Sequence, residues 1–124
     1  MAQLRYINCF ECGTTFQADL EQEQCFCTGK CKDRWNNRRR LRGAELYDLF
    51  MNMRFDRAAA KEAGVWSVMC RMASQWRHED DNAFNIGKTK RPGRKSFSPI
   101  RRVLQRNVRY QAVLNRVSRK IADQ

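Results

Sequence analysis

The side chains best suited to chemistry are cysteines near the start of the chain. Two residues separate Cys9 from Cys12, and three separate Cys27 from Cys31. Thiolates are preferred ligands of Zn²⁺, and four of them close a tetrahedral site that leaves no open position for catalysis. The spacing therefore predicts one structural zinc ion bound by Cys9, Cys12, Cys27 and Cys31.

A fifth cysteine, Cys25, competes for the third ligand position because it lies two residues before Cys27. We choose Cys27 because Phe26 and Cys27 lead through Cys31 directly into a basic helical segment. The alternative is that Cys25, and not Cys27, is the third zinc ligand. Six cysteines and a start that lacks an apolar secretory signal favour a metal over disulfides and predict a cytoplasmic, reducing compartment.

Short elements must position these thiols. Gly13 follows Cys12 at a tight turn, where glycine accepts a conformation that other residues resist. Strands over residues 5–9 and 14–18 are expected on either side of this turn. At a spacing of four, Cys27 and Cys31 lie on one side of a helix's first turn, whose free N–H groups stabilise thiolates. The expected fold class is mainly α with a small N-terminal β-hairpin.

The order Cys9-x2-Cys12-Gly13-x2-Phe16, then Phe26-Cys27-x3-Cys31 and a basic helix, resembles a family of treble-clef zinc fingers. Such four-cysteine fingers occur in small DNA-associated proteins of phages and mobile elements. The resemblance covers about residues 6–42. It implies a finger of hairpin and helix that contacts DNA, RNA or a protein.

The net charge of +12 is concentrated in two blocks, +6 over residues 28–42 and +11 over residues 86–124. Charge blocks of this kind bind polyanions or acidic partners, and a merely soluble basic surface is the alternative. Nucleic acid, DNA rather than RNA, is the predicted partner, and the protein would then be nucleoid-associated. The residues predicted to contact it are Arg38, Arg39, Arg40, Arg42, Arg71, Lys88, Lys90, Arg91, Arg94, Lys95, Arg101, Arg102, Arg106 and Arg109.

An enzyme is not expected. Leu, Ile, Val and Phe make up about a fifth of the residues, too few for a large enzyme core. His78 is the single histidine, so a nuclease of the HNH type would lack its base and metal ligands. The apolar runs are too short to span a membrane.

Residues 43–80 predict a helical hairpin. Gly43 is expected to break or kink the preceding helix, after which Leu46, Phe50 and Met53 recur at helical spacing. Residues 58–76 resemble the helix-turn-helix of phage repressors, in which Gly64 makes the turn. In that pattern Ala60 lets the helices approach, and Val65 and Cys70 pack inward.

Two alternatives accompany this hairpin. It can be purely structural, with a core of Trp66, Met69, Ala73 and Trp76. Alternatively, Trp66, Val68 and Met72 can be apolar anchors of a basic adaptor or inhibitor that docks on an acidic host protein, such as transcription or defence machinery.

The last two parts of the chain are a basic linker over residues 81–97, expected to be mobile, and a basic amphipathic helix over residues 98–124. Ser98 and Pro99 are typical of a helix start. Apolar residues then step by three and four from Ile100 to Ile121, with Asn107 among them, as in dimeric coiled coils. A homodimer through residues 100–121 is therefore possible. Because its arginines repel, we expect this helix to pack by its apolar stripe on its own domain or a different partner and to present its arginines to nucleic acid.

These observations divide the chain into a zinc finger with its basic helix (1–42), a helical hairpin (43–80), a linker (81–97) and a terminal helix (98–124). They predict a small zinc-binding, nucleic-acid-binding regulatory protein of the phage or mobile-element type.

Overall fold

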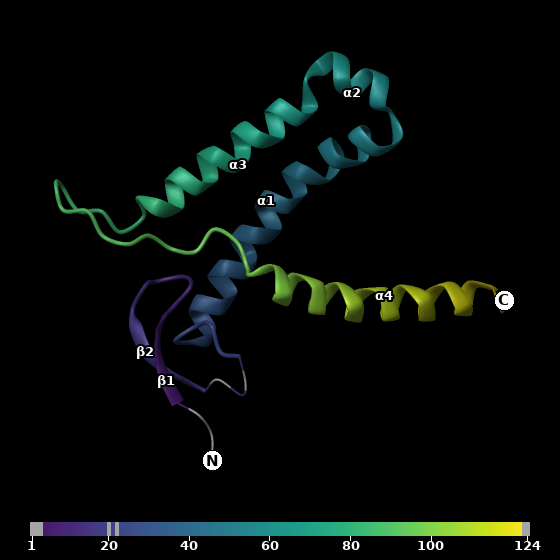
Figure 1. Cartoon of the computed structure of the whole chain (residues 1–124). Coiled ribbons are helices and arrows are strands. Elements are labelled where there is room, and N and C mark those ends of the chain that lie inside the picture. Colours follow the sequence, from purple (N-terminus) through teal and green to yellow (C-terminus); the bar gives the residue numbers. More distant parts are fainter. Residues whose placement is uncertain (1–3, 20, 22, 123–124) are drawn as a thin grey trace.

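The computed structural model describes residues 4–19, 21 and 23–122 of the chain (Figure 1). It is mainly α-helical with an N-terminal β-hairpin, as predicted. The elements are β1 (Leu4–Asn8), β2 (Thr15–Asp19), α1 (Gly29–Phe55), α2 (Arg57–Ala63), α3 (Val65–Asp81) and α4 (Ile100–Ala122).

The hairpin pairs β1 and β2 antiparallel, with Leu4 opposite Asp19 and Asn8 opposite Thr15. Both strands lie within one residue of their predicted bounds. Ala18 is fully buried on the inner face. The turn between the strands carries the first two cysteines, so the hairpin fixes that half of the cluster.

Helix α1 is longer than the sequence suggested. It begins after Thr28, whose side chain accepts a hydrogen bond from the Cys31 N–H, and it continues through Gly43 to Phe55. The predicted break at Gly43 is therefore wrong. A glycine inside a helix costs only about 1 kcal/mol, and a long helix that packs on neighbours tolerates this cost.

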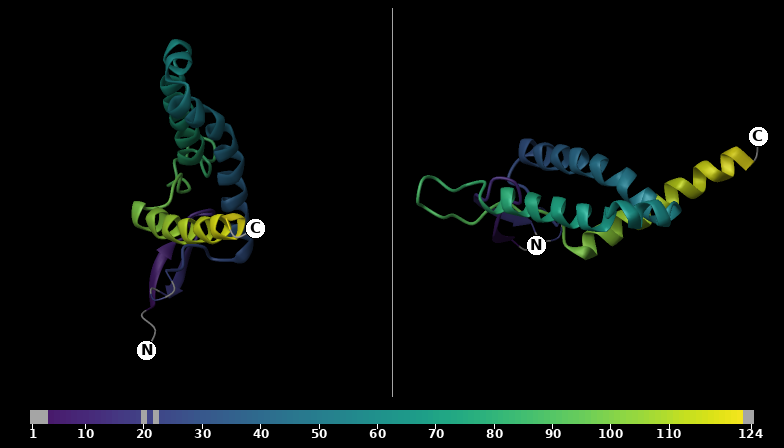
Figure 2. Two further views of the ribbon diagram at one scale, coloured as in Figure 1. Left: turned by 90° about the vertical axis from the view of Figure 1, so that its right-hand side faces the viewer. Right: turned by 90° about the horizontal axis from the view of Figure 1, so that it is seen from above.

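The turn at Gly64 is confirmed. Gly64 has φ +69°, in the left-handed region, and ends α2 by donating its N–H to Ala60 O and Lys61 O. Ala60 and Val65 are buried on either side of it, as the helix-turn-helix pattern predicted. Helices α1 and α3 lie side by side and α2 closes the tip of the hairpin (Figures 1 and 2).

Helix α3 buries one narrow stripe of side chains. Val65 and Asp80 are buried and Met69, Met72 and Trp76 are half-buried, a helical spacing of three and four. Cys70 lies off this stripe and is exposed, so its predicted inward packing is wrong. The alternative core is also wrong in two of its members, because Trp66 and Ala73 are exposed.

The segment between α3 and α4 is not a free tether. It is irregular apart from one bridge between Ile86 and Thr89. The Lys95 N–H donates to Phe10 O at 3.0 Å, and the Trp35 indole N–H donates to Lys95 O at 3.3 Å. These bonds hold residues 94–97 against the hairpin and α1.

Helix α4 projects away from the rest of the molecule (Figures 1 and 2). Within the described ranges it packs against no other helix or strand, and none of its residues is buried. The expected packing of its apolar stripe on the same chain is therefore wrong. None of the helices in the described part of the chain is long and apolar enough to cross a membrane.

Candidate functional site

Four thiols converge beside the hairpin. The Sγ atoms of Cys9, Cys12, Cys27 and Cys31 all lie within 4.8 Å of one another. Cys27 Sγ is 3.6 Å from Cys12 Sγ and 3.7 Å from Cys31 Sγ. Four sulfurs about 2.3 Å from a tetrahedral Zn²⁺ lie about 3.8 Å apart, so the cluster has the size and donor set to hold one metal ion. Cys25 lies outside it.

The turn after β1 presents the first two thiols. Gly13 has φ +73° and donates its N–H to Cys9 O at 3.0 Å, which closes the turn around Cys12. A Cβ at Gly13 would lie 3.1 Å from the Phe84 ring, so a larger residue would also displace that ring. The positive φ therefore favours glycine at this position, and the nearby ring adds a tight contact for any larger residue.

The other two thiols flank the start of α1. Cys31 lies in the first turn of the helix, whereas Cys27 precedes the cap residue Thr28. The prediction that both cysteines lie on the helix's first turn is therefore wrong for Cys27. Its own N–H donates to Cys9 Sγ at 3.4 Å, so the extended backbone before the helix still supports the cluster.

The thiols differ in their ease of ionisation. A side-chain hydrogen bond with Thr14 lowers the pKa of Cys12 to about 6. Burial, with the neighbouring sulfurs, raises the pKa of Cys27 to about 12. Without a metal, Cys12 is therefore mostly ionised at neutral pH whereas Cys27 keeps its proton, which a bound cation must displace.

An aromatic cluster joins the finger to the rest of the chain. The rings of Phe10, Phe26 and Trp35 have centroids 5.7–6.2 Å apart. Trp35 is buried on α1, and the segment after α3 covers it through Lys95. The cysteine spacing could not reveal this contact, because it joins residues 60 positions apart.

Three of the arginines predicted to contact phosphates are paired with buried acids of the same chain. Arg38 forms two hydrogen bonds to the buried carboxylate of Glu11, at 2.5 and 2.7 Å. Arg42 forms two more to Asp80, at 2.8 and 3.2 Å, and Arg94 is 3.4 Å from the same carboxylate. Sequence reasoning missed these pairs because the acids are distant in the chain. These arginines hold the finger, α3 and the connecting segment together.

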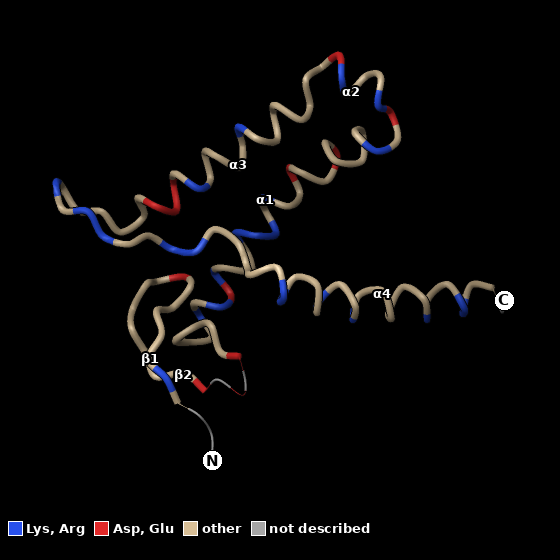
Figure 3. The backbone as a smooth tube through the Cα atoms, viewed as in Figure 1, with Lys and Arg blue, Asp and Glu red and all other residues tan. Residues whose placement is uncertain are grey.

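The remaining predicted cations lie on α1, α3 and α4 and in the segment that connects α3 to α4. Arg39 and Arg40 on α1, Arg71 on α3, and Lys88, Lys90, Arg91 and Lys95 in the connecting segment are exposed. On α4, Arg102 donates to Glu23 O at 2.8 Å and contacts Cys25 Sγ at 2.6 Å, while Arg101 lies 3.9 Å from Glu23. The basic residues of α4 follow one side of the helix (Figure 3), and no ion pair of the described chain involves those from Arg106 onward.

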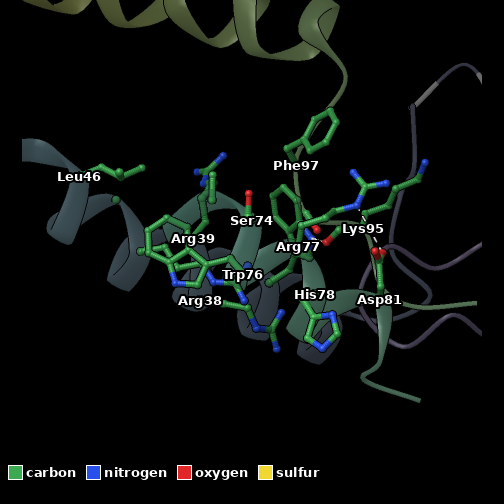
Figure 4. A pocket seen from close by; sticks show the side chains of 15 residues that line it. Arg38, Arg39, Leu46, Ser74, Trp76, Arg77, His78, Asp81, Lys95 and Phe97 are labelled. Atoms are coloured by element: carbon green, nitrogen blue, oxygen red, sulfur yellow. Dashed lines mark hydrogen bonds and ion pairs between the residues drawn. The ribbon is translucent and has the colours of Figure 1, made fainter. Parts of the chain in front are cut away.

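A cleft of about 700 Å³ opens between α1 and α3, next to the last residues before α4 (Figure 4). Its walls combine aromatic and cationic side chains. Arg39 lies over the Trp35 ring at 5.7 Å, and Arg77 lies over the Phe97 ring at 5.8 Å. The exposed cations Arg39 and Lys95 both line the cleft.

The three predicted apolar anchors are not presented together. Trp66 is 65% exposed near the tip of the hairpin. Val68 and Met72 are half-buried, and Met72 belongs to the stripe that faces inward. Trp66 is thus the strongest of the three as a contact for another molecule.

No family model, curated protein or solved structure matches the chain.

Proposed function

We propose that this chain is a zinc-stabilised nucleic-acid-binding protein, with DNA the better-fitting partner and a regulatory role in a phage or mobile element. The observation that carries the proposal is the outer side of α4. Seven Lys and Arg residues and no acid lie between Ile100 and Ala122. At about 1.5 Å per residue this helix extends about 35 Å, which is long enough to follow many phosphates.

The exposed cations elsewhere extend this surface. Five of these cations are exposed to solvent, namely Arg39 and Arg40 on α1 and Lys88, Lys90 and Arg91 in the connecting segment. Arg38, Arg42 and Arg94 are left out of the proposal, because a phosphate would have to displace Glu11 or Asp80 from them.

The metal site supports binding rather than catalysis. Cys9, Cys12, Cys27 and Cys31 would hold one Zn²⁺ through four thiolates, which leave a substrate no coordination position. The metal would fix the hairpin to the start of α1. In a chain with so small an apolar core, this link contributes folding energy directly.

Salt dependence tests the proposal. The zinc-loaded, nuclease-treated chain should bind a fluorescent duplex, with the logarithm of the affinity falling linearly against the logarithm of salt concentration. The slope should be about −0.9 times the number of phosphates neutralised. Matched single-stranded and RNA probes of the same length test the preference for duplex DNA. No binding at low salt, or a flat salt dependence, rejects the proposal.

Charge-neutralising variants locate the surface. Replacing Arg109, Arg116 and Arg119 by Gln should flatten the salt slope by up to about 2.7, the value for three phosphates. The matched control removes three charges from the hairpin tip, at Arg54, Arg57 and Lys61, and should leave the slope almost unchanged. Equal effects of the two triple variants would show that only net charge matters.

An acidic host protein is the second candidate partner, because Trp66 is exposed beside a cavity of about 530 Å³ that Phe50, Met53 and Val65 also line. Aromatic anchors in such pockets dominate many interfaces. A stoichiometric partner retained from lysate after nuclease treatment, and lost in Trp66→Ala, would favour this function. Release of all bound material by nuclease would favour the first.

A further inference from the structure

Helix α4 exposes an apolar stripe along its whole length. Its large apolar residues, from Ile100 to Ile121, are between 37% and 71% exposed. Within the described part of the chain this helix of 23 residues packs on no other helix or strand, and a helix without such packing is only marginally stable in water. Monomeric proteins rarely leave so long an apolar surface open, so this stripe indicates an interface.

We propose that α4 pairs with α4 of a second copy of this chain as a parallel two-stranded coiled coil. The stripe has the spacing that such a seam requires, alternating steps of three and four over three heptads. The a positions are Ile100, Asn107, Leu114 and Ile121, and the d positions are Val103, Tyr110 and Val117.

The charges beside the seam are compatible with this pairing. In a parallel pair, each g residue faces the e residue five positions later on the partner. Arg106 then faces the partner's Gln111, and Val113 faces the partner's Ser118. No two cations meet across the seam, so no direct contact between like charges opposes a parallel dimer.

The antiparallel arrangement is disfavoured by the same residues. There g faces g, so in the register that keeps Ile121 in the seam Arg106 would meet the partner's Lys120. Asn107 would face Val117 of the partner subunit in that register and the partner's Tyr110 in the register shifted by one heptad, so its amide would not meet its counterpart. In the parallel register Asn107 meets its own counterpart, and a polar pair at one a position fixes the register and favours two strands.

The other cations of α4 occupy the outer b, c and f positions, namely Arg101, Arg102, Arg109, Arg116 and Arg119. The contact of Arg102 with Cys25 and Glu23 therefore lies off the seam and does not compete with pairing. Pairing would present two outward basic sides, but the proposal does not depend on what those sides bind.

Sedimentation equilibrium of the zinc-loaded, nuclease-treated full chain tests the pairing. About 0.5 M NaCl suppresses nucleic-acid bridging and leaves apolar association intact. We expect twice the 14.7 kDa chain mass. Leu114→Ala removes a seam residue from both chains and should weaken the dimerisation Kd by at least about 100-fold, with helicity checked by circular dichroism.

Val108→Ala is the matched control, because Val108 is on the same helix at an outer b position and is 69% exposed. Its Kd should stay within about threefold of the wild type. A monomeric mass at every concentration up to about 100 μM, or equal effects of Leu114→Ala and Val108→Ala, would overturn the proposal.

Arg106→Glu tests the orientation. In the parallel pair the new carboxylate faces the neutral side chain of the partner's Gln111, so the Kd should change by less than about threefold. A tightening of about tenfold or more would place it beside the partner's Lys120 and would overturn the parallel arrangement. Failure of pairing would leave salt-dependent nucleic-acid binding by a monomer intact, and failure of binding would leave the mass unchanged.

Discussion

The variant Asp80→Asn tests the junction between the finger, α3 and the connecting segment. Asp80 has no solvent exposure, and its carboxylate accepts hydrogen bonds from Arg42 and Arg94. The variant keeps the shape of the side chain but removes its charge. Two guanidinium groups, 17% and 21% exposed, then lose their shared anion.

The expected loss of stability is about 3 kcal/mol. Removing one partner from a buried pair costs about 3–5 kcal/mol, and the lower end applies because water reaches the arginines. Urea unfolding of the zinc-loaded protein, followed by tryptophan fluorescence, measures this difference. The control is Asp81→Asn, the next residue, which is 56% exposed and forms one ion pair within the described residues, with Arg77 at 3.3 Å. Its cost should be below about 0.5 kcal/mol.

The pH dependence supplies a second check. Burial opposes ionisation of Asp80, but hydrogen bonds and charge from the arginines outweigh it and hold its pKa below the ordinary value of 3.8. The wild type's advantage over Asp80→Asn should be complete above about pH 4 and should vanish as the pH falls through the lowered pKa. Equal losses from Asp80→Asn and Asp81→Asn, or an advantage that persists in strong acid, would refute the argument.

Three further perturbations test the cluster, the connecting segment and α1. Native mass spectrometry should find one zinc ion in the wild type and in Cys25→Ser but none in Cys27→Ser, and zinc affinity should fall with acidification because binding displaces thiol protons. Gly93→Ala should destabilise the chain by about 2 kcal/mol or more in urea and remove hydrogen-exchange protection from residues 94–97, because its Cβ would clash with the backbone oxygen of Asp80. Gly43→Ala meets nothing within 4 Å and should raise the free energy of unfolding by about 0.5–1 kcal/mol, whereas destabilisation would show that α1 needs a glycine there.

Local patterns in the sequence predicted the local parts of the fold. The hairpin and the turn at Gly64 depend on residues close in sequence, and the four-cysteine cluster depends on a spacing typical of metal ligands. The break predicted at Gly43 was wrong, because the free-energy cost of one glycine in a helix is small compared with the packing energy of a long helix. The inward packing predicted for Cys70 was wrong, because the buried stripe of α3 is narrower than the distribution of its apolar residues suggests.

Long-range ion pairs were beyond sequence reasoning. Nothing in the spacing of Arg38 or Arg42 shows that Glu11 and Asp80 will face them, since these pairs are 27 and 38 residues apart. The sequence prediction counted every arginine of a basic block as free to bind phosphates, and it therefore overestimated the number of arginines available for nucleic acid. The cations of α4 are less affected by this correction, because the helix itself contains no acid and its one ion pair within the described residues joins Arg101 to Glu23 at 3.9 Å.

The two roles of arginine thus separate by position in the fold. Arginines of α1 and the connecting segment that point inward neutralise buried carboxylates and connect the four-cysteine region to the helical hairpin. Arginines on the outer side of α4 have no comparable acids, and repulsion between them raises the free energy of the isolated chain. A polyanion along that side would relieve the repulsion, whereas pairing of the apolar side would not, so the two sides of α4 call for two different partners.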